Sequence, residues 1–254
     1  EFYQSGLDSD DDPYKNINLH KALAYSNGSG NMLGAGEVIA IMDGGFLISG
    51  AGLNSFTHQE FAGKTITALN TTYFSTYNFN TNSHGTGVAG IAAGTFGTGF
   101  SMGVAPEASL HIHEPFYTGT ASSYAGWWAL GTDDARSDGA VVQNNSWGFD
   151  DSQTLNASET AYNASYAIND YVAYKNNNSL SSSATFAAHA SLDNDSNGAN
   201  DILYSNTATQ WDTYITALNS FQNSGVIVFA LTNNATYDDA DVSAALPELE
   251  PEFE

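Results

Sequence analysis

Residues 37–43, Glu-Val-Ile-Ala-Ile-Met-Asp, form an apolar run that two glycines follow, and this run limits the folds that the chain can adopt. An uninterrupted apolar run of this length between turn residues predicts a β-strand that is buried on both faces. Similar strands are predicted at residues 110–116, 141–147 and 225–231. A chain with several such strands is expected to fold around a sheet that is covered on both sides.

Helical segments accompany these predicted strands, at residues 19–25, 85–93, 121–135 and 207–221. The last segment carries an apolar stripe at helical spacing, formed by Trp211, Ile215, Leu218 and Phe221. Buried strands that alternate with helices predict an α/β fold of three layers around a central, mostly parallel sheet. In such folds, functional sites form at the carboxyl ends of the strands.

The chain has 254 residues, enough for one large domain or two small ones. Residues 1–18 are acidic and irregular and predict a solvated N-terminal arm, so that residues 19–254 form the folded domain. Residues 150–205 are rich in Asn, Ser, Ala and Tyr and interrupt the alternation of strands and helices. We interpret them as a helix at about 157–175 followed by an insertion loop, not as a second domain.

Composition excludes several classes of function. Five Lys and Arg residues stand against 28 Asp and Glu, a formal net charge of −23, so we expect neither a nucleic-acid partner nor an anionic membrane partner. The absence of cysteine excludes disulfides, a thiol nucleophile and thiolate zinc sites. No apolar run approaches the ~20 residues that span a bilayer, so no membrane-spanning segment is expected. The acidic, Asn- and Ser-rich composition favours a secreted or cell-surface protein.

Two residues stand where catalytic groups are commonly held. Asp43 ends the first buried strand, although a carboxylate there can equally serve only as a turn or cap residue. His84 opens a glycine-rich helix, where the alternative is a polar cap. Because each glycine weakens a helix by about 1 kcal/mol, the glycines at 87, 90 and 94 predict close packing near the start of this helix.

Five segments, taken in their order along the chain, resemble those of the subtilisin-like serine proteases, the subtilases. They are Val-Ile-Ala-Ile-Met-Asp43-Gly-Gly with His58-Gln-Glu-Phe61, His84-Gly-Thr-Gly-Val-Ala-Gly-Ile, Met102-Gly-Val-Ala-Pro-Glu-Ala-Ser-Leu110, Asn145-Ser-Trp-Gly148, and Gly225-Val-Ile-Val-Phe-Ala-Leu-Thr-Asn-Asn234. The form Asn-Asn-Ser-Trp-Gly is also similar to the protease passenger domains of bacterial autotransporters.

The resemblance implies a subtilisin-like fold and a serine endopeptidase that acts on polypeptides. It implies that Asp43 and His84 are two members of a catalytic triad. It also implies that Asn234, with Asn233 as the alternative, donates to the oxyanion. The strand end Ser146, Trp147 and Gly148 would then pair with an extended substrate, although Trp147 can instead be a core residue.

The sequence departs from the family at the nucleophile. No Gly-Thr-Ser motif follows Asn234, and Ser243, the one serine after it, lies in Val-Ser-Ala-Ala. We expect a peptidase domain truncated at its C-terminus, whose serine is carried by a separate C-terminal fragment. Two alternatives are a protease-like module that has lost activity and binds peptides or serves in assembly, and a different chemistry.

Two further clusters could hold metal ions. Asp193, Asp195, Asn197 and Asp201 have the spacing of a calcium loop, with Gly198 at the sixth position, and predict structural calcium, but Tyr204 stands where the loop needs a bidentate acid. The alternative is an acidic surface turn. His111, His113 and Glu114 follow one another on a predicted strand and suggest zinc, but satisfied strand histidines are the favoured interpretation. No organic cofactor is expected.

Overall fold

The computed structural model describes residues 17, 19–24, 33–46, 58–69, 84–97, 102–115, 124–147, 179, 181, 184 and 207–230. The described elements follow in the order α2 (Leu19–Ala24), β1 (Val38–Met42), η1 (Gln59–Phe61), β2 (Ile66–Ala68), α4 (His84–Ala93), β3 (Ser109–His113), α5 (Tyr124–Ser137), β4 (Ala140–Asn145), α8 (Ala208–Gln222) and β5 (Val226–Phe229).

The strands form one five-stranded sheet in the order β2-β3-β1-β4-β5. Every neighbouring pair is parallel, and β1 lies in the middle. Met42, the last residue of β1, is in register with His113 of β3 and with Asn145 of β4, so the three strands end together. The sheet therefore has one edge at which side chains from different strands can meet.

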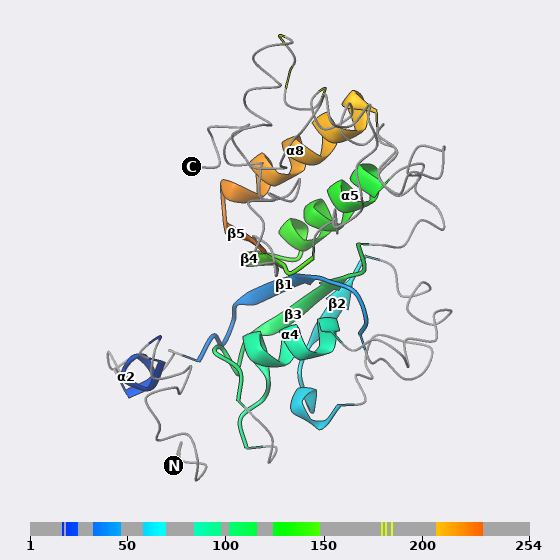
Figure 1. The fold of residues 1–254 in the computed structure, drawn as a ribbon. Coiled ribbons are helices and arrows are strands. Elements are labelled where there is room, and N and C mark those ends of the chain that lie inside the picture. The colour runs from blue at the N-terminus through cyan, green and yellow to red at the C-terminus, as the bar shows by residue number, and fades with distance from the viewer. Residues whose placement is uncertain are drawn as a thin grey trace, which may run out of the picture.

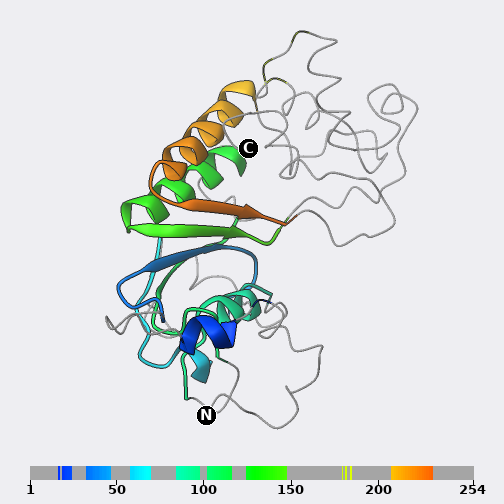
Figure 2. The same ribbon diagram turned by 90° about the vertical axis from the view of Figure 1, so that its left-hand side faces the viewer.

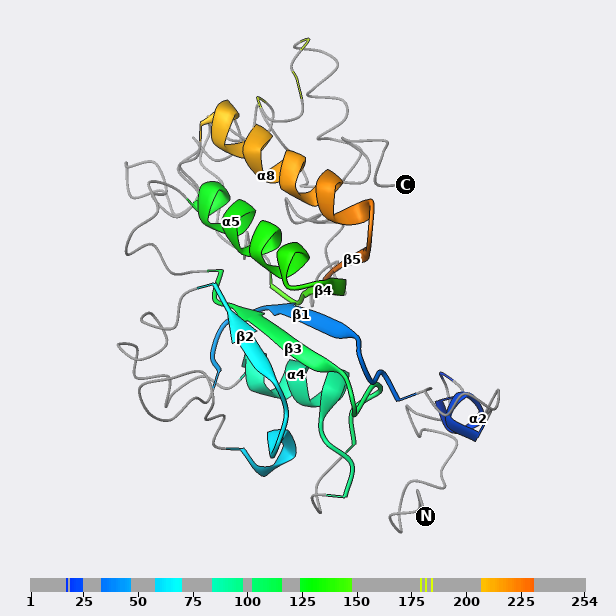
Figure 3. The ribbon, with the colours of Figure 1, turned by 180° about the vertical axis from the view of Figure 1, so that it is seen from behind.

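Helices cover both faces of this sheet, as Figure 1 shows: α5 and α8 lie on one face, and α4 lies on the other. The side view separates the three layers (Figure 2), and the view from behind shows α5 and α8 side by side (Figure 3). The three-layer α/β fold with a parallel sheet is thus confirmed. The strand connections run through helices because parallel neighbours cannot be joined by a tight turn.

Two apolar cores hold the layers together. On the α4 face, Ile41 of β1 and Leu110 and Ile112 of β3 pack with Ala89 and Ala93 of α4. On the other face, aromatic residues dominate, and Trp128 of α5 lies 5.6 Å from Trp211 of α8 between ring centroids. The predicted stripe of α8 is confirmed, since its four members are all buried: Trp211, Ile215, Leu218 and Phe221. Thr207 caps this helix in a capping box with Gln210.

The four predicted strands are confirmed, with ends that shift by one to three residues. β2 was missed because it has only three residues at the edge of the sheet, of which Ile66 alone is buried. Nearly all of the N-terminal arm, the predicted helix at 157–175 and most of the insertion lie outside the described residues. Within the described part of the chain, no helix is both long enough and apolar enough to cross a bilayer.

Candidate active site

Asp43 lies at the carboxyl end of β1, the central strand, where its own backbone N–H donates 2.9 Å to the carbonyl of His113. The chain then turns sharply, and Gly45 adopts a φ of 81°, a left-handed conformation that favours glycine. This turn leaves the Asp43 side chain 2% exposed. A buried carboxylate is thereby fixed at the edge of the sheet by backbone on both sides.

His84 is the first residue of α4, and the start of this helix is bonded to the turn after β1. The N–H of Gly85 donates 2.8 Å to the carbonyl of Gly44, and the N–H of Thr86 donates 3.2 Å to that of Gly45. Two of the amides that a helix start leaves unsatisfied are thus used to anchor it. At Gly85 a Cβ atom would come within 2.9 Å of the Phe46 ring, so this close approach requires glycine.

The two predicted triad residues meet as a result. Nδ1 of His84 lies 2.7 Å from Oδ1 of Asp43, the distance of a strong, charge-assisted hydrogen bond. The Asp43 side chain is 2% exposed and that of His84 54% exposed, so the carboxylate is enclosed while the imidazole reaches solvent. A buried carboxylate behind a half-exposed imidazole can orient the ring and stabilise its protonated form.

Burial raises the pKa of Asp43 above its ordinary value. The hydrogen bond and charge of His84 and the backbone N–H of Gly44 lower the pKa, but burial outweighs them. The second oxygen, Oδ2, is buried and has no hydrogen-bond partner within the described segments. The carboxylate charge is therefore poorly solvated, and a positive charge that develops on His84 would compensate it.

Glu114, which the sequence suggested only as a zinc ligand, supports this site instead. Its carboxylate oxygen Oε2 accepts a hydrogen bond of 3.0 Å from the N–H of Gly45. Glu114 follows β3 directly, and β3 pairs with β1, so its side chain reaches the turn after Asp43. The signal for this role is its position one residue beyond a predicted strand, but using it requires the order of the strands.

Two of the three glycines at 87, 90 and 94 are closely packed, but they lie in the second half of α4 and just after it, not near its start as predicted. A Cβ atom at Gly90 would lie 2.9 Å from Oε2 of Glu60, and one at Gly94 would lie 3.3 Å from the N atom of Gly103. At Gly87 nothing lies within 4 Å. The tightest contact at the start of the helix is that of Gly85, which the sequence did not single out.

The predicted substrate strand is described only in part. The hydroxyl of Ser146 accepts a 2.7 Å hydrogen bond from the side-chain amide of Asn144. Trp147 is buried, and its ring centroid lies 4.7 Å from that of Trp128, which agrees with the alternative of core packing. The carbonyl of Asn145 accepts from the N–H of Ala230, so an added peptide strand could pair only beyond this residue.

Several predicted site residues lie outside the described residues, and the structure leaves them as predictions. They are Gly148, the oxyanion candidates Asn233 and Asn234, and the calcium-loop residues Asp193, Asp195, Asn197 and Asp201.

His111 and His113 share one face of β3, as their spacing predicts, and both meet α5. His113 packs against Gly131 and against Trp127, with 4.7 Å between ring centroids. Burial, with a smaller contribution from the charge of His111, lowers the pKa of His113 to about 3, so this ring is neutral at physiological pH. His111, His113 and Glu114 point to different partners and form no common zinc site.

A comparison with protein families gives one match: the subtilase family, peptidase S8, over residues 34–248. The match covers well over half of the chain, and the chain therefore belongs to the subtilase family. The structure agrees, since the parallel sheet and the Asp43–His84 pair lie inside the matched region. No curated protein sequence matches the chain.

Three solved structures align with the chain over part of their length. MycP1 from the ESX-1 type VII secretion system aligns with a TM-score of 0.40 and 17% identity over 88% of this chain and 46% of its own. MycP3 protease from the type VII (ESX-3) secretion system aligns with a TM-score of 0.33 and 23% identity over 66% of this chain and 43% of its own. The prenylagaramide maturation protease PagA aligns with a TM-score of 0.33 and 19% identity over 84% of this chain and 72% of its own. The chain spans less than half the length of the two MycP structures.

Proposed function

We propose that this chain carries the Asp and His half of the catalytic machinery of a subtilisin-like serine endopeptidase. The observation that carries the proposal is the 2.7 Å contact between Nδ1 of His84 and Oδ1 of Asp43 at the carboxyl end of the central strand. Membership of the subtilase family makes peptide-bond hydrolysis the reaction that this pair would serve.

In the proposed reaction His84 is the general base. Its Nδ1–H donates to Asp43, which leaves the lone pair of Nε2 to accept the proton of a serine hydroxyl as that oxygen attacks the peptide carbonyl. The imidazolium that forms is stabilised by the buried carboxylate and then passes its proton to the leaving amine. Asn234 would donate to the negative oxygen of the tetrahedral intermediate, and this assignment rests on the sequence motif alone.

The nucleophile is proposed to come from outside these 254 residues, because none of their serines stands in the family's Gly-Thr-Ser motif. A second polypeptide segment that brings a serine hydroxyl to His84 would complete the triad. The half-exposed ring of His84 supports this, because it leaves the imidazole accessible from solvent.

The substrate is proposed to be an extended polypeptide that pairs with the backbone at Ser146–Gly148, beyond the last ladder bond of β4. The strongly acidic composition supports our proposal that the protein is secreted or lies at the cell surface. The acidic loop at Asp193–Asp201 is proposed to bind structural calcium through its carboxylate and amide oxygens.

A fluorophosphonate probe tests the function, because it labels only an activated serine. Material from the natural source should yield a labelled polypeptide that contains or co-purifies with this chain, and His84→Ala should abolish both labelling and peptide hydrolysis. His58→Ala, which removes a partly exposed histidine at the start of η1, is the matched control and should keep both.

The second candidate, a protease-like module that binds peptides without cleaving them, is favoured by the missing serine motif. Absence of label on every associated polypeptide, together with retained binding of unfolded peptides, would favour it. Unchanged turnover in His84→Ala would contradict the protease proposal.

A further inference from the structure

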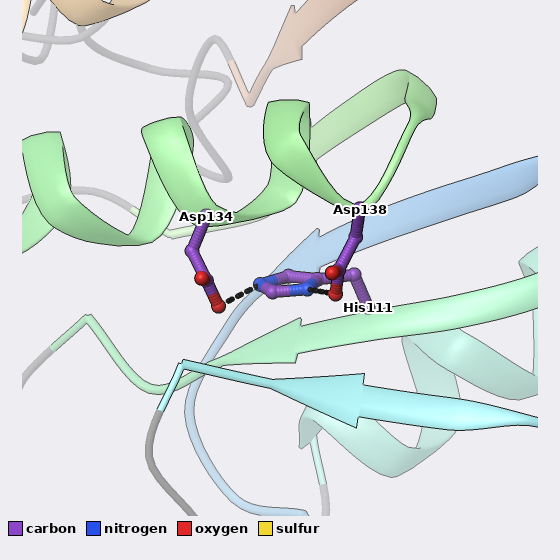
Figure 4. Close-up of side chains that lie close together, drawn as sticks. All are labelled: His111, Asp134 and Asp138. Carbon is purple, nitrogen blue, oxygen red and sulfur yellow. Dashed lines mark hydrogen bonds and ion pairs between the residues drawn. The ribbon is translucent and has the colours of Figure 1, made fainter.

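A second titratable cluster lies away from the Asp43–His84 pair, between β3 and the end of α5. Figure 4 shows the imidazole of His111 held between two carboxylates, with Asp138 at one ring nitrogen and Asp134 at the other. One potential ligand atom from each of these residues lies within 4.8 Å of the others. The cluster is independent of the proposed catalytic residues.

The contact with Asp138 fixes the ring. Nδ1 of His111 lies 2.8 Å from Oδ2 of Asp138. A carboxylate oxygen accepts at this distance, so Nδ1 of His111 donates its hydrogen to Asp138.

The other nitrogen of His111 faces Asp134 without a hydrogen bond. His111 is 1% exposed, and Nε2 has no hydrogen-bond partner in the described part of the chain. Its distance to Oδ2 of Asp134 is 3.8 Å, beyond the range of a hydrogen bond. In the neutral tautomer that donates from Nδ1 to Asp138, the lone pair of Nε2 points towards this carboxylate oxygen, and a cation can lie between the two atoms.

A metal ion between these two atoms would accept an electron pair from each of them. Zinc binds imidazole nitrogen at about 2.0–2.1 Å and carboxylate oxygen at about 2.0–2.2 Å, so at the tetrahedral angle an N and an O that share the ion lie roughly 3.3–3.5 Å apart. The 3.8 Å separation is wider by a few tenths of an ångström, a shift that the partly exposed Asp134 side chain can make. A histidine that binds a metal through one nitrogen also commonly donates its other N–H to a carboxylate, as His111 does to Asp138.

The surroundings favour a cation as well. The Asp134 and Asp138 side chains are 32% and 35% exposed, which leaves room for an ion to enter and keep water ligands. The formal net charge of −23 raises the local concentration of cations around the whole chain.

We propose that Nε2 of His111 and the carboxylate of Asp134 bind a divalent cation of the zinc class, with Asp138 orienting the imidazole. Mixed imidazole and carboxylate ligands suit zinc better than calcium, which prefers oxygen ligands alone. The ion would fasten the last turn of α5 to β3. Its role is structural, and its binding does not depend on the proposed proteolysis.

Titration of the metal-free protein with Zn²⁺ in a calorimeter, and with Co²⁺ by visible absorption, tests this site. The wild-type protein is expected to bind one Zn²⁺ saturably in the presence of excess Ca²⁺, which occupies all-oxygen sites. Asp134→Asn should weaken Zn²⁺ binding at least tenfold, and Asp138→Asn should weaken it about 10–100-fold. Asp133→Asn, the same charge change on an exposed neighbour that pairs with Arg136, should change it less than twofold.

Thermal unfolding with and without Zn²⁺ gives a second readout, since an ion that binds only the folded state raises its melting temperature by several degrees. This rise should be present in the wild type and in Asp133→Asn and absent in Asp134→Asn. If Asp134→Asn does not fold, His111→Gln takes its place in both measurements. The proposal is overturned if the wild type binds no Zn²⁺ saturably, or if Asp134→Asn binds it as tightly as the wild type.

Discussion

The backbone N–H of Gly45 donates a 3.0 Å hydrogen bond to the carboxylate of Glu114, which ties the turn after Asp43 to the end of β3. Gly45 is buried, so loss of its acceptor would leave an unsatisfied amide inside the molecule. We expect Glu114→Ala to lower the free energy of unfolding by about 1–3 kcal/mol, measured by urea denaturation.

Glu114→Gln keeps an oxygen that can accept from Gly45 and should restore most of this stability. Glu107→Ala removes an exposed glutamate from the loop that precedes β3 and serves as the control. Equal stability of Glu114→Ala and Glu107→Ala would mean that the bond to Gly45 contributes nothing.

Asp43→Asn should separate activity from stability. Because the pKa of Asp43 is higher in the folded protein than in the unfolded chain, protonation of this carboxyl stabilises the fold. The contribution is full below about pH 4 and is lost as the pH rises through the pKa of the folded state. At neutral pH, Asp43→Asn should therefore melt at or above the wild-type temperature, and the difference should shrink towards about pH 4. A melting temperature several degrees lower at neutral pH would show that the pairing with His84 outweighs burial.

The same Asp43→Asn variant should lose peptidase activity by roughly four orders of magnitude, measured as kcat. This is the size of loss known for the equivalent carboxylate of subtilisin itself and is not an independent estimate. Retained activity would show that Asp43 does not assist His84.

His113 makes the fold sensitive to acid. Its folded pKa of about 3 lies below the value of about 6.5 in an unfolded chain, so only the unfolded chain takes up a proton between these values. The neutral His113 ring therefore contributes its full stabilisation, a few kcal/mol, above about pH 6.5. Below that pH the free energy of unfolding falls by on the order of 1 kcal/mol per pH unit. The free energy of unfolding should fall more steeply with acid in the wild type than in His113→Gln, and equal slopes would contradict this role of His113.

Two helix glycines should respond to alanine in opposite directions. At Gly131 of α5 a Cβ atom would lie 2.5 Å from the ring of the buried His113, so Gly131→Ala should cost about 1–3 kcal/mol of stability. At Gly87 of α4 nothing lies within 4 Å, so Gly87→Ala should add about 0.5–1 kcal/mol through helix propensity. Chemical denaturation measures both, and a loss of stability at Gly87 would contradict the open space around it.

The strands β1, β3, β4 and β5 could be predicted because each contains apolar residues in a short segment, a pattern that needs no knowledge of the neighbouring strands. The Asp43–His84 pair could be predicted because both residues lie in motifs that resemble a known family. The short edge strand β2 could not, since it buries only Ile66 and has no periodic pattern of its own.

Contacts that depend on the order of the strands also escaped prediction. Glu114 reaches Gly45 only because β3 pairs with β1. The first residues of these two strands lie 71 positions apart in the chain. His111 meets Asp134 and Asp138 only because α5 packs over β3. Gly87 was misjudged because spacing alone does not tell which side of a helix faces a neighbour.

The tautomer of the His84 imidazole gives the decisive test of the proposed function, since nitrogen and proton NMR can read it without a substrate. The proposal predicts a hydrogen on Nδ1, with a strongly deshielded, exchange-protected signal that disappears in Asp43→Asn. A hydrogen on Nε2 of the neutral ring, or an Nδ1 signal that Asp43→Asn leaves unchanged, would contradict the role of His84 as a base oriented by Asp43.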